Sequence, residues 1–507
     1  MSDGSVHAAL RSDHPLVLVE APAGCGKTYQ GAEYARELVK TSARGKPLIL
    51  THTHAACSVF AERTSGHRNA IDIRTIDSVI ARIAGAYHKG LGIPADTSAW
   101  VRKQGESGHA QLAVKVSGFV KRYPIITASL ARRHPVVICD EHQDSSGEQH
   151  ALVMALLDQG AKLRVFADPM QKIFSEKVLD GSCPPCDWNE LKNAAQACEE
   201  LDVPHRWKDG AAALGDWTLA ARKTLRGGGV IDLTGALPDG LRVVFAENNA
   251  KKHGDYLLDK AGRKPVDLFV EKEESLLVLT RHNQTVRAFR GFFGRRLPLW
   301  EGHMRVGLEK LVNAVTAADG DSAKVGAAIV TFMEDIGKGF SPSAFGDAFQ
   351  QEISDGCTKH RTGKPNAIQE LARHVVKNPN HRGVSAMLRR RAERKAQDAQ
   401  FSDIEFDNYR EFHDAIRLGN FTDAETGLAE ITHHRTYARP KPPARAISTI
   451  HKAKGLECDS VVVMPCDAKT FPAKDDARCL LYVALSRARY RLMLVLSKDN
   501  PSPLFKM

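Results

Sequence analysis

The sequence predicts an α/β fold built on parallel sheets, with a largely helical domain inserted into its second half. Short, continuous apolar runs alternate with amphipathic helical patterns along much of the chain. Such runs are typical of strands in parallel sheets, because helices cover both faces of those sheets. A chain of 507 residues also exceeds what one hydrophobic core organises, so roughly three or four structural units are expected.

Apolar runs that end in polar or glycine-rich residues mark the expected strands. In the first half of the chain these runs are Leu16–Val19, Leu48–Leu50, Val136–Cys139 and Leu163–Phe166. A second set follows at Leu276–Leu279, Val461–Met464 and Leu492–Leu496. The pieces of the second set lie far apart in the sequence, so an insertion between them is predicted.

The insertion is expected to occupy roughly residues 295–443. Helical patterns such as Gly307–Val315 dominate there, and runs typical of buried strands are nearly absent. Proline cannot continue a helix and stiffens an extended chain. The proline-rich stretch Arg439–Arg445 is therefore interpreted as the linker that returns to the second sheet.

Composition restricts the class of protein. Hydrophobic residues make up 43% and charged residues 26% of the chain, which excludes wholesale disorder. The net charge of +11 favours contact with a phosphate backbone, although a protein without nucleic acid can carry the same excess. The sequence contains no run of about 18 apolar residues and no signal-peptide pattern, so neither membrane insertion nor secretion is expected.

The 10 cysteines are scattered through the chain, which favours reduced thiols and a cytoplasmic location. One CxxC pattern occurs, at Cys183–Cys186. This pattern is a weak signal for zinc or redox chemistry, because no second Cys or His pair stands nearby in the sequence. Two ordinary loop cysteines are the expected interpretation.

A glycine-rich segment, Ala21–Thr28 with the sequence APAGCGKT, lies between the first expected strand and a helical pattern at Tyr29–Lys40. This is the arrangement of a phosphate-binding P-loop. Its backbone N–H groups and the helix amino terminus favour phosphate oxygens, Lys27 reaches the β and γ phosphates, and the Thr28 hydroxyl ligates Mg²⁺. The expected cofactor-binding residues are Ala23, Gly24, Cys25, Gly26, Lys27 and Thr28.

The apolar run Val136–Cys139 ends in two acids, Asp140 and Glu141. At the mouth of a phosphate pocket, Asp140 would hold Mg²⁺ and Glu141 would polarise the attacking water as a general base. Without the P-loop, these acids would be an ordinary solvated strand end.

The segment Asp140–Asp144 (DEHQD) resembles the DExQD motif of UvrD/Rep-like superfamily 1 DNA helicases. Further segments follow in the order found in that family. Leu50–Ala56 resembles motif Ia and Arg74–Ser78 is similar to the TFHS segment, and both contact single-stranded DNA in the family. The resemblance thus assigns His52, Thr53, Thr75 and Ser78 to DNA binding.

The resemblance extends to four later motifs. Phe166–Phe174 is similar to motif III, and His205–Arg206 resembles motif IV. Thr449–Glu457 and Tyr482–Arg489 resemble motifs V and VI. The resemblance implies that Gln171 senses the γ phosphate and that Arg206 is a phosphate ligand. It implies that Glu457 contacts the nucleotide sugar and that Arg487 is an arginine finger. Phe174 and His451 are the implied DNA contacts.

The sequence departs from the family pattern at several places. No glutamine stands near Val6 and His7, where the family carries the residue that recognises adenine. His52 replaces a phenylalanine, and Ser175–Lys177 replaces the Trp-Arg-Gly that follows motif III. The basic segment Leu388–Lys395 is expected either to contact duplex backbone or a partner, or to form a solvated helix face.

By this resemblance the chain contains two RecA-like motor domains. The first, 1A, is expected at residues 1–85 and 130–195, with a short accessory insertion, 1B, at 86–129. The second, 2A, is expected at 196–294 and 444–507, with the helical domain 2B at 295–443.

Two functions remain open from the sequence. The first is an ATP-dependent translocase or helicase that uses Mg²⁺. The resemblance implies movement 3′ to 5′ on single-stranded DNA or single/double-strand junctions. The second is a DNA-sensing ATPase subunit that regulates a separate nuclease. The short accessory insertion and the lack of a fused nuclease resemble the UvrD-like component of anti-phage systems such as Gabija, which works beside an OLD-family endonuclease.

Overall fold

The computed structural model describes residues 2–41, 45–67, 69–104, 107–174, 179, 181–247, 256–300, 306–338, 342–395, 405–406, 408–438 and 443–507. The chain forms two compact units. The sheet unit comprises residues 1–297 and 443–507, and the helical unit comprises Pro298–Pro442.

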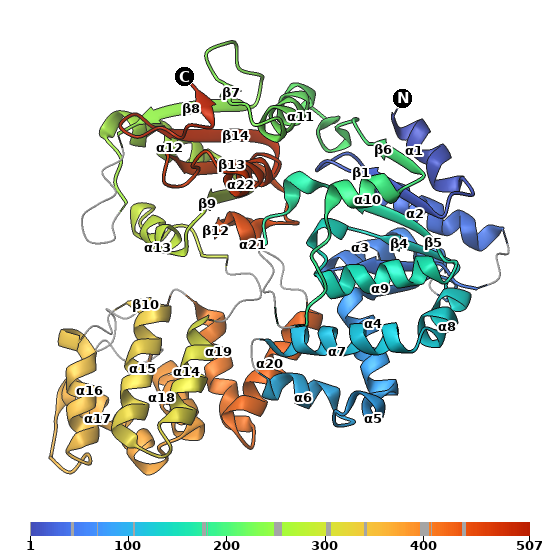
Figure 1. Cartoon of the computed structure of the whole chain (residues 1–507). Helices are drawn as coiled ribbons and strands as arrows, with labels where there is room; N and C mark the ends of the chain where they lie inside the picture. The colour runs from blue at the N-terminus through green and yellow to red at the C-terminus, as the bar shows by residue number, and fades with distance from the viewer. Residues whose placement is uncertain are drawn as a thin grey trace. The chain divides into compact units, whose positions relative to one another are not determined.

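The first sheet of the sheet unit has six parallel strands in the order β3-β2-β4-β5-β1-β6 (Figure 1). Its strands are β1 (Leu16–Glu20), β2 (Leu48–Thr51), β3 (Asp72–Thr75), β4 (Val136–Cys139), β5 (Lys162–Ala167) and β6 (Ala197–Glu200). Because the strands are parallel, all their carboxyl ends lie at one edge of the sheet. The P-loop after β1 and the acids after β4 therefore meet at that edge.

Alternate residues of each central strand enter different cores. Leu16 and Leu18 of β1 pack in one hydrophobic cluster with helices on one face of the sheet. Val17 and Val19 pack in a second cluster on the opposite face. Side chains alternate across a strand, so a continuous apolar run is what a sheet covered on both faces requires.

Helices cover both faces of this sheet. One face carries α1 (Ser2–Arg11), α2 (Lys27–Lys40) and α3 (His54–Arg63). The other carries α4 (Ile76–Ala86), α5 (His88–Leu91), α6 (Thr97–Lys103), α7 (Gly108–Arg122), α8 (Ile125–Arg133) and α9 (Gly147–Asp158). Helices α5 to α8 thus share the core beneath the sheet, and α10 (Trp188–Ala194) leads into β6.

The second sheet has five parallel strands in the order β12-β9-β13-β14-β8. They are β8 (Leu241–Ala246), β9 (Leu276–Thr280), β12 (Arg445–Thr449), β13 (Cys458–Cys466) and β14 (Ala488–Ser497). In Figure 1 the green strand β9 lies between the red strands β12 and β13, although 164 residues separate Thr280 from Arg445 in the sequence. The inserted segment therefore leaves the second sheet after β9 and returns to it at the adjacent strand β12.

Further helices and a short strand pair belong to the sheet unit. They are α11 (Ala212–Arg226), α12 (Lys260–Lys272), α13 (Asn283–Phe292), α21 (Ile450–Ala453), α22 (Asp475–Leu485) and the short parallel pair β7 (Ile231–Asp232) and β15 (Phe505–Lys506).

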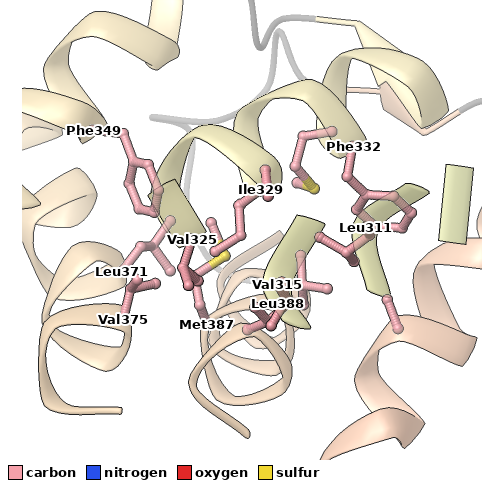
Figure 2. Close-up of a cluster of buried hydrophobic side chains, with 14 of the residues drawn as sticks. Leu311, Val315, Val325, Ile329, Phe332, Phe349, Leu371, Val375, Met387 and Leu388 are labelled. Atoms are coloured by element: carbon pink, nitrogen blue, oxygen red, sulfur yellow. The ribbon is translucent and has the colours of Figure 1, made fainter. Parts of the chain in front are cut away.

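The helical unit is built around one apolar cluster, part of which is drawn in Figure 2. Its helices are α14 (Val306–Ala317), α15 (Ser322–Ile336), α16 (Asp347–Ser354), α17 (Gly363–Lys377), α18 (His381–Lys395), α19 (Tyr409–Arg417) and α20 (Ala424–Ala438). A two-residue antiparallel pair, β10 (Gly337–Lys338) with β11 (Glu405–Phe406), completes its described part. Figure 2 shows Ile329, Phe349 and Leu371 from three of these helices directed into a common interior.

The predicted α/β fold class with parallel sheets is confirmed. Each expected apolar run lies within an observed strand. Strands β3 and β6 were not expected, because Asp72–Thr75 and Ala197–Glu200 carry charged residues typical of edge strands rather than apolar runs. Within the described residues, no helix is both long and apolar enough to cross a membrane.

The proline-rich linker is described only in part. Residues 439–442 lie outside the described residues, and β12 begins at Arg445, the last residue of the expected linker. The division into four domains stays a prediction.

Leu371→Ala tests the core of the helical unit. Leu371 has no exposed surface, so this truncation should lower the free energy of unfolding by about 2–5 kcal/mol. Leu268→Ala, at a side chain that is 48% exposed, should change it by less than about 0.5 kcal/mol. Urea unfolding of the full chain, followed by circular dichroism, measures both. Coincident unfolding curves for the two variants would contradict the assigned core.

Candidate functional site

The P-loop is shaped by two glycines and by a short helix packed against them. Gly24 and Gly26 have φ angles of 78° and 86°, in the left-handed region that favours glycine. A β-carbon on Gly24 would lie 2.7 Å from Cζ3 of Trp207, and one on Gly26 would lie 3.1 Å from Cδ2 of His205. The segment His205–Trp207 therefore leaves no room for a side chain at Gly24 and little room for one at Gly26.

Lys27 lies between the two acids that follow β4. Its ammonium group pairs with Glu141 and lies 4.0 Å from Oδ1 of Asp140. Burial lowers the pKa of Lys27 and raises that of Asp140, so attraction between these charges does not fully offset the lost solvation. Among the described residues, none donates a hydrogen bond to the buried Oδ1 of Asp140. An available carboxylate oxygen of this kind suits a hard divalent cation.

Glu141 adopts a left-handed backbone conformation, with φ of 55°. Such a conformation costs a residue other than glycine about 1–3 kcal/mol, and persists where the surroundings impose it. The amide of Gln143 donates to the Glu141 carboxylate, and its oxygen accepts a 3.0 Å hydrogen bond from the Asp168 N–H. The position of the Glu141 carboxylate is thus tied to the end of β5.

Gln171 and Lys454 connect this edge with the second half of the chain. Gln171 is buried and donates to Oδ2 of Asp168 at 2.9 Å. The Lys454 ammonium, which follows α21, donates to both Asp144 carboxylate oxygens at 2.7 and 2.6 Å and to the Gln171 carbonyl. One cation therefore bridges the segments that resemble motifs II, III and V.

Arg206 lies beside the P-loop. Its backbone N–H donates to the Gly24 carbonyl at 3.0 Å. Its guanidinium donates to the Glu457 carboxylate and to the Ser486 carbonyl. The expected phosphate ligand and the expected sugar contact are thus neighbours.

Arg487 is 2% exposed, which excludes a surface role. Its guanidinium donates to the carbonyls of Val483 and Leu456 at 2.9 and 3.2 Å and to the Ser486 hydroxyl at 2.7 Å. Burial, and then the neighbouring Arg206 charge, lowers the pKa of Arg487 to about 10. The group therefore keeps its charge at neutral pH.

Thr53 and Thr75 both cap helices. Thr53 accepts a hydrogen bond from the Ala56 N–H at the start of α3, and Thr75 accepts one from the Ser78 N–H at the start of α4. Thr53 is exposed, whereas Thr75 is buried. Capping is therefore a structural reason for both threonines, and Thr53 is the one whose side chain also faces solvent.

Phe174, from the segment that resembles motif III, lies beside His451, from the segment that resembles motif V. Their ring centroids are 6.0 Å apart, and the Lys454 ammonium lies 5.3 Å from the Phe174 centroid. Phe174 is 49% exposed, so one side of its ring is accessible. His52 lies elsewhere on this edge, where its Nε2 contacts the Ser145 hydroxyl at 3.2 Å. Burial lowers the pKa of His52.

Two family models match the chain. A UvrD-like helicase C-terminal domain matches residues 445–495, and an AAA domain matches residues 6–177. Over these residues the chain is similar to UvrD/Rep-like helicases. A comparison with curated proteins found no match. The two matched domains support an ATP-dependent hydrolase of helicase superfamily 1, and this class implies use of a nucleotide, a divalent metal and DNA.

The matched regions contain most of the expected site. Residues 6–177 include Lys27, Asp140 and Gln171, and residues 445–495 include Glu457 and Arg487. Arg206 lies outside both. Its assignment depends on the hydrogen bond to Gly24 and on its contact with Glu457.

Sequence reasoning missed a buried cation. Arg222 on α11 is 1% exposed and pairs with Glu20, at the end of β1, and with Asp168, at 2.8 Å. Burial opposes its charge, but Asp168, Tyr482 and Glu20 together more than offset that effect, and the pKa of Arg222 is raised. The Tyr482 hydroxyl, which accepts a 2.9 Å hydrogen bond from the Ala23 N–H, was missed as well. An amphipathic helix gives no sequence signal that one arginine faces inward.

The interpretation of Cys183 and Cys186 as two loop cysteines stays a prediction, but the fold brings Cys186 close to two histidines. His142, His150 and Cys186 place potential ligand atoms within 4.8 Å of one another. The two histidines were not recognised because they precede the cysteines by more than thirty residues and His142 lies inside the motif II segment. Burial lowers the pKa of His142 to about 3 and also lowers that of His150, so both imidazoles are neutral at pH 7.

Two further expectations concern residues outside the candidate site, the segment after motif III and the basic segment Leu388–Lys395. Ser175–Lys177 lies outside the described residues. In the basic segment, Arg391 is fully buried and Arg390 and Arg394 pair with Glu370, so it is not simply a solvated face.

Arg222→Ala tests the buried ion pairs. Removing this cation leaves Glu20 and Asp168 buried without it and should lower the free energy of unfolding by about 3–5 kcal/mol. Arg226→Ala is the control, because Arg226 pairs with the same Glu20 from a side chain that is 37% exposed and should cost about 1 kcal/mol or less. Equal losses in urea unfolding would show that Arg222 has no special role.

Proposed function

We propose that the chain is an ATP-driven DNA translocase or helicase that moves 3′ to 5′ on single-stranded DNA or at single/double-strand junctions. The proposal rests on contacts at the P-loop edge of the first sheet. These contacts join the P-loop and the segments that resemble motifs II and III to the segments that resemble motifs IV, V and VI. Arg206 contacts Gly24, Tyr482 contacts Ala23, and Lys454 contacts Asp144 and Gln171.

ATP and Mg²⁺ fit the residues at this edge. The left-handed glycines let the loop take the tight turn of a P-loop, and Lys27 lies at the amino terminus of α2, where helix dipoles favour phosphate. In this proposal Lys27 exchanges its contact with Glu141 for the β and γ phosphates. Thr28 and the available Oδ1 of Asp140 hold Mg²⁺, which neutralises phosphate charge when bound.

Hydrolysis then depends on four side chains. Glu141, released by Lys27, accepts a proton from the attacking water, and Gln171 senses the γ phosphate. Arg206 and Arg487 stabilise the negative charge that shifts among phosphate oxygens. Glu457, already paired with Arg206, lies where it can contact the sugar of the same nucleotide.

The DNA contacts lie on the segments that follow neighbouring strands. His52 and Thr53 follow β2, whereas Thr75 is the last residue of β3 and Ser78 follows that strand. Phe174 offers an exposed ring for base stacking beside His451. The net charge of +11 supports a polyanionic partner.

Lys454 connects a residue expected to sense the nucleotide with a residue expected to contact DNA. It binds the carbonyl of the expected sensor Gln171, and its ammonium also lies over the ring of Phe174. A shift of Gln171 during hydrolysis would therefore move a cation that touches the stacking residue. Such a contact suits conversion of cleft closure into a step along a strand.

A second candidate is a DNA-sensing ATPase subunit that controls a separate nuclease, of the OLD family in the anti-phage analogy. It is favoured by the packing of α5 to α8 into the core beneath the first sheet, which leaves the accessory insertion small. Robust duplex unwinding by the chain alone would favour the helicase. DNA-stimulated hydrolysis without unwinding would favour the subunit.

Lys27→Ala and Arg487→Ala should each lower the DNA-stimulated rate of ATP hydrolysis by about 1,000-fold or more, because phosphate charge loses its stabilising cation. Arg489→Ala is the matched control from the same segment. Arg489 is 44% exposed and pairs with Asp459, so its loss should leave the rate unchanged. Phosphate release is measured with and without single-stranded DNA and RNA. Absence of stimulation by either nucleic acid would rule out the translocase.

Phe174→Ala should weaken binding to single-stranded DNA by about 1–3 kcal/mol, roughly 5- to 150-fold in Kd, through loss of stacking. Phe245→Ala serves as the control because Phe245 is 42% exposed on β8, away from the expected DNA contacts. Fluorescence anisotropy with a labelled oligonucleotide measures both affinities. Similar affinities for the two variants would remove Phe174 from the DNA interface.

A further inference from the structure

Three potential metal ligands from separate segments converge beside α9. His142 belongs to the short helix after β4 (His142–Asp144), His150 lies on α9, and Cys186 precedes α10. Their ligand atoms all lie within 4.8 Å of one another, and His142 Nε2 lies 3.0 Å from His150 Nδ1. One sulfur and two imidazole nitrogens are therefore within reach of a single ion.

The His142 ring is held with Nε2 directed at His150. Its other nitrogen, Nδ1, lies 3.1 Å from the Ser145 hydroxyl, which also contacts His52 at 3.2 Å. A hydrogen bond to the outer nitrogen is how proteins orient an imidazole ligand. His142 is 1% exposed, so this orientation is fixed by packing as well.

The turn that carries Cys186 is built against the same helix. The Cys183 N–H donates to the Glu148 carboxylate at 2.8 Å, and the Cys183 sulfur lies 3.2 Å from the Ser117 hydroxyl. A β-carbon on Gly147 would lie 2.1 Å from the Cys183 carbonyl oxygen, so this close approach requires glycine at the start of α9. Cys186 itself packs against the hydrophobic core beneath the first sheet.

We propose that His142, His150 and Cys186 bind a Zn²⁺ ion. One thiolate and two neutral imidazoles form a donor set that favours zinc over magnesium or calcium. Three protein ligands leave one tetrahedral position for water. On binding, the Cys186 thiol releases its proton to solvent and its sulfur forms the bond to the metal.

Such an ion would fasten the turn that carries Cys186 to α9, the helix that follows the motif II acids. It would also fix His142, two residues beyond Asp140, and through Ser145 the expected DNA contact His52. This site is separate from the donor set of Asp140 and Thr28, and it does not depend on the proposed ATPase.

Metal content of the untagged, full-length chain tests the proposal. After incubation with Zn²⁺ and removal of loosely bound ions, the protein should retain about one zinc per chain. Cys186→Ser and His150→Ala should lose that zinc, and Cys198→Ser, which alters an exposed cysteine, should retain it. Zinc binding that is absent from the unaltered protein, or equal in Cys186→Ser and Cys198→Ser, would overturn the site and leave only a hydrogen-bonded histidine pair.

Replacement of zinc by Co²⁺ gives a second readout that needs no variant to fold. A thiolate ligand produces a sulfur-to-cobalt charge-transfer absorption in the unaltered chain, and this band should persist in Cys198→Ser. A cobalt complex of the unaltered chain without that band would contradict ligation by Cys186. Circular dichroism identifies any variant that loses zinc merely because it is unfolded.

Discussion

The guanidinium of Arg222 is buried in the sheet unit and bound to carboxylates at the ends of three strands, β1, β5 and β6. Glu20 ends β1 and directly precedes the P-loop, and Asp168 follows β5 and accepts a hydrogen bond from Gln171. The Arg222 guanidinium carbon also lies 6.0 Å from the ring centroid of Tyr482 on α22. Charges removed from water in this way are tolerated only when they are fully paired, so the spacing of all three elements is constrained together.

The sequence determines the first sheet most clearly where both faces are buried. Val136–Cys139 was identifiable because four consecutive apolar side chains can be satisfied only between two layers of helices. Strand β6 carries Glu199 and Glu200 at an edge, and its strand character comes from pairing with β1. Edge strands of this kind depend on a neighbour distant in sequence, which local patterns do not encode.

The residues of the candidate site also differ in how far the sequence predicts them. Lys27, Asp140 and Glu141 were predictable, because a P-loop and an acidic strand end are local patterns whose chemistry is set by spacing. The pairing of Lys454 with Asp144 joins residues 310 positions apart, and the approach of Cys186 to His142 depends on a glycine at Gly147. Those contacts arise only when the chain is folded, so residue spacing in the sequence does not predict them.

The packing of Trp207 has a spectroscopic consequence. Its indole has no exposed surface, its N–H donates to the Ala488 carbonyl at 2.8 Å, and the ring closely approaches Gly24 and Gly215. The Arg206 guanidinium carbon lies 5.3 Å from the ring centroid. Indole emission responds to nearby charge and to water, so this side chain is an intrinsic optical probe, built into the chain, for any rearrangement of the phosphate-binding loop.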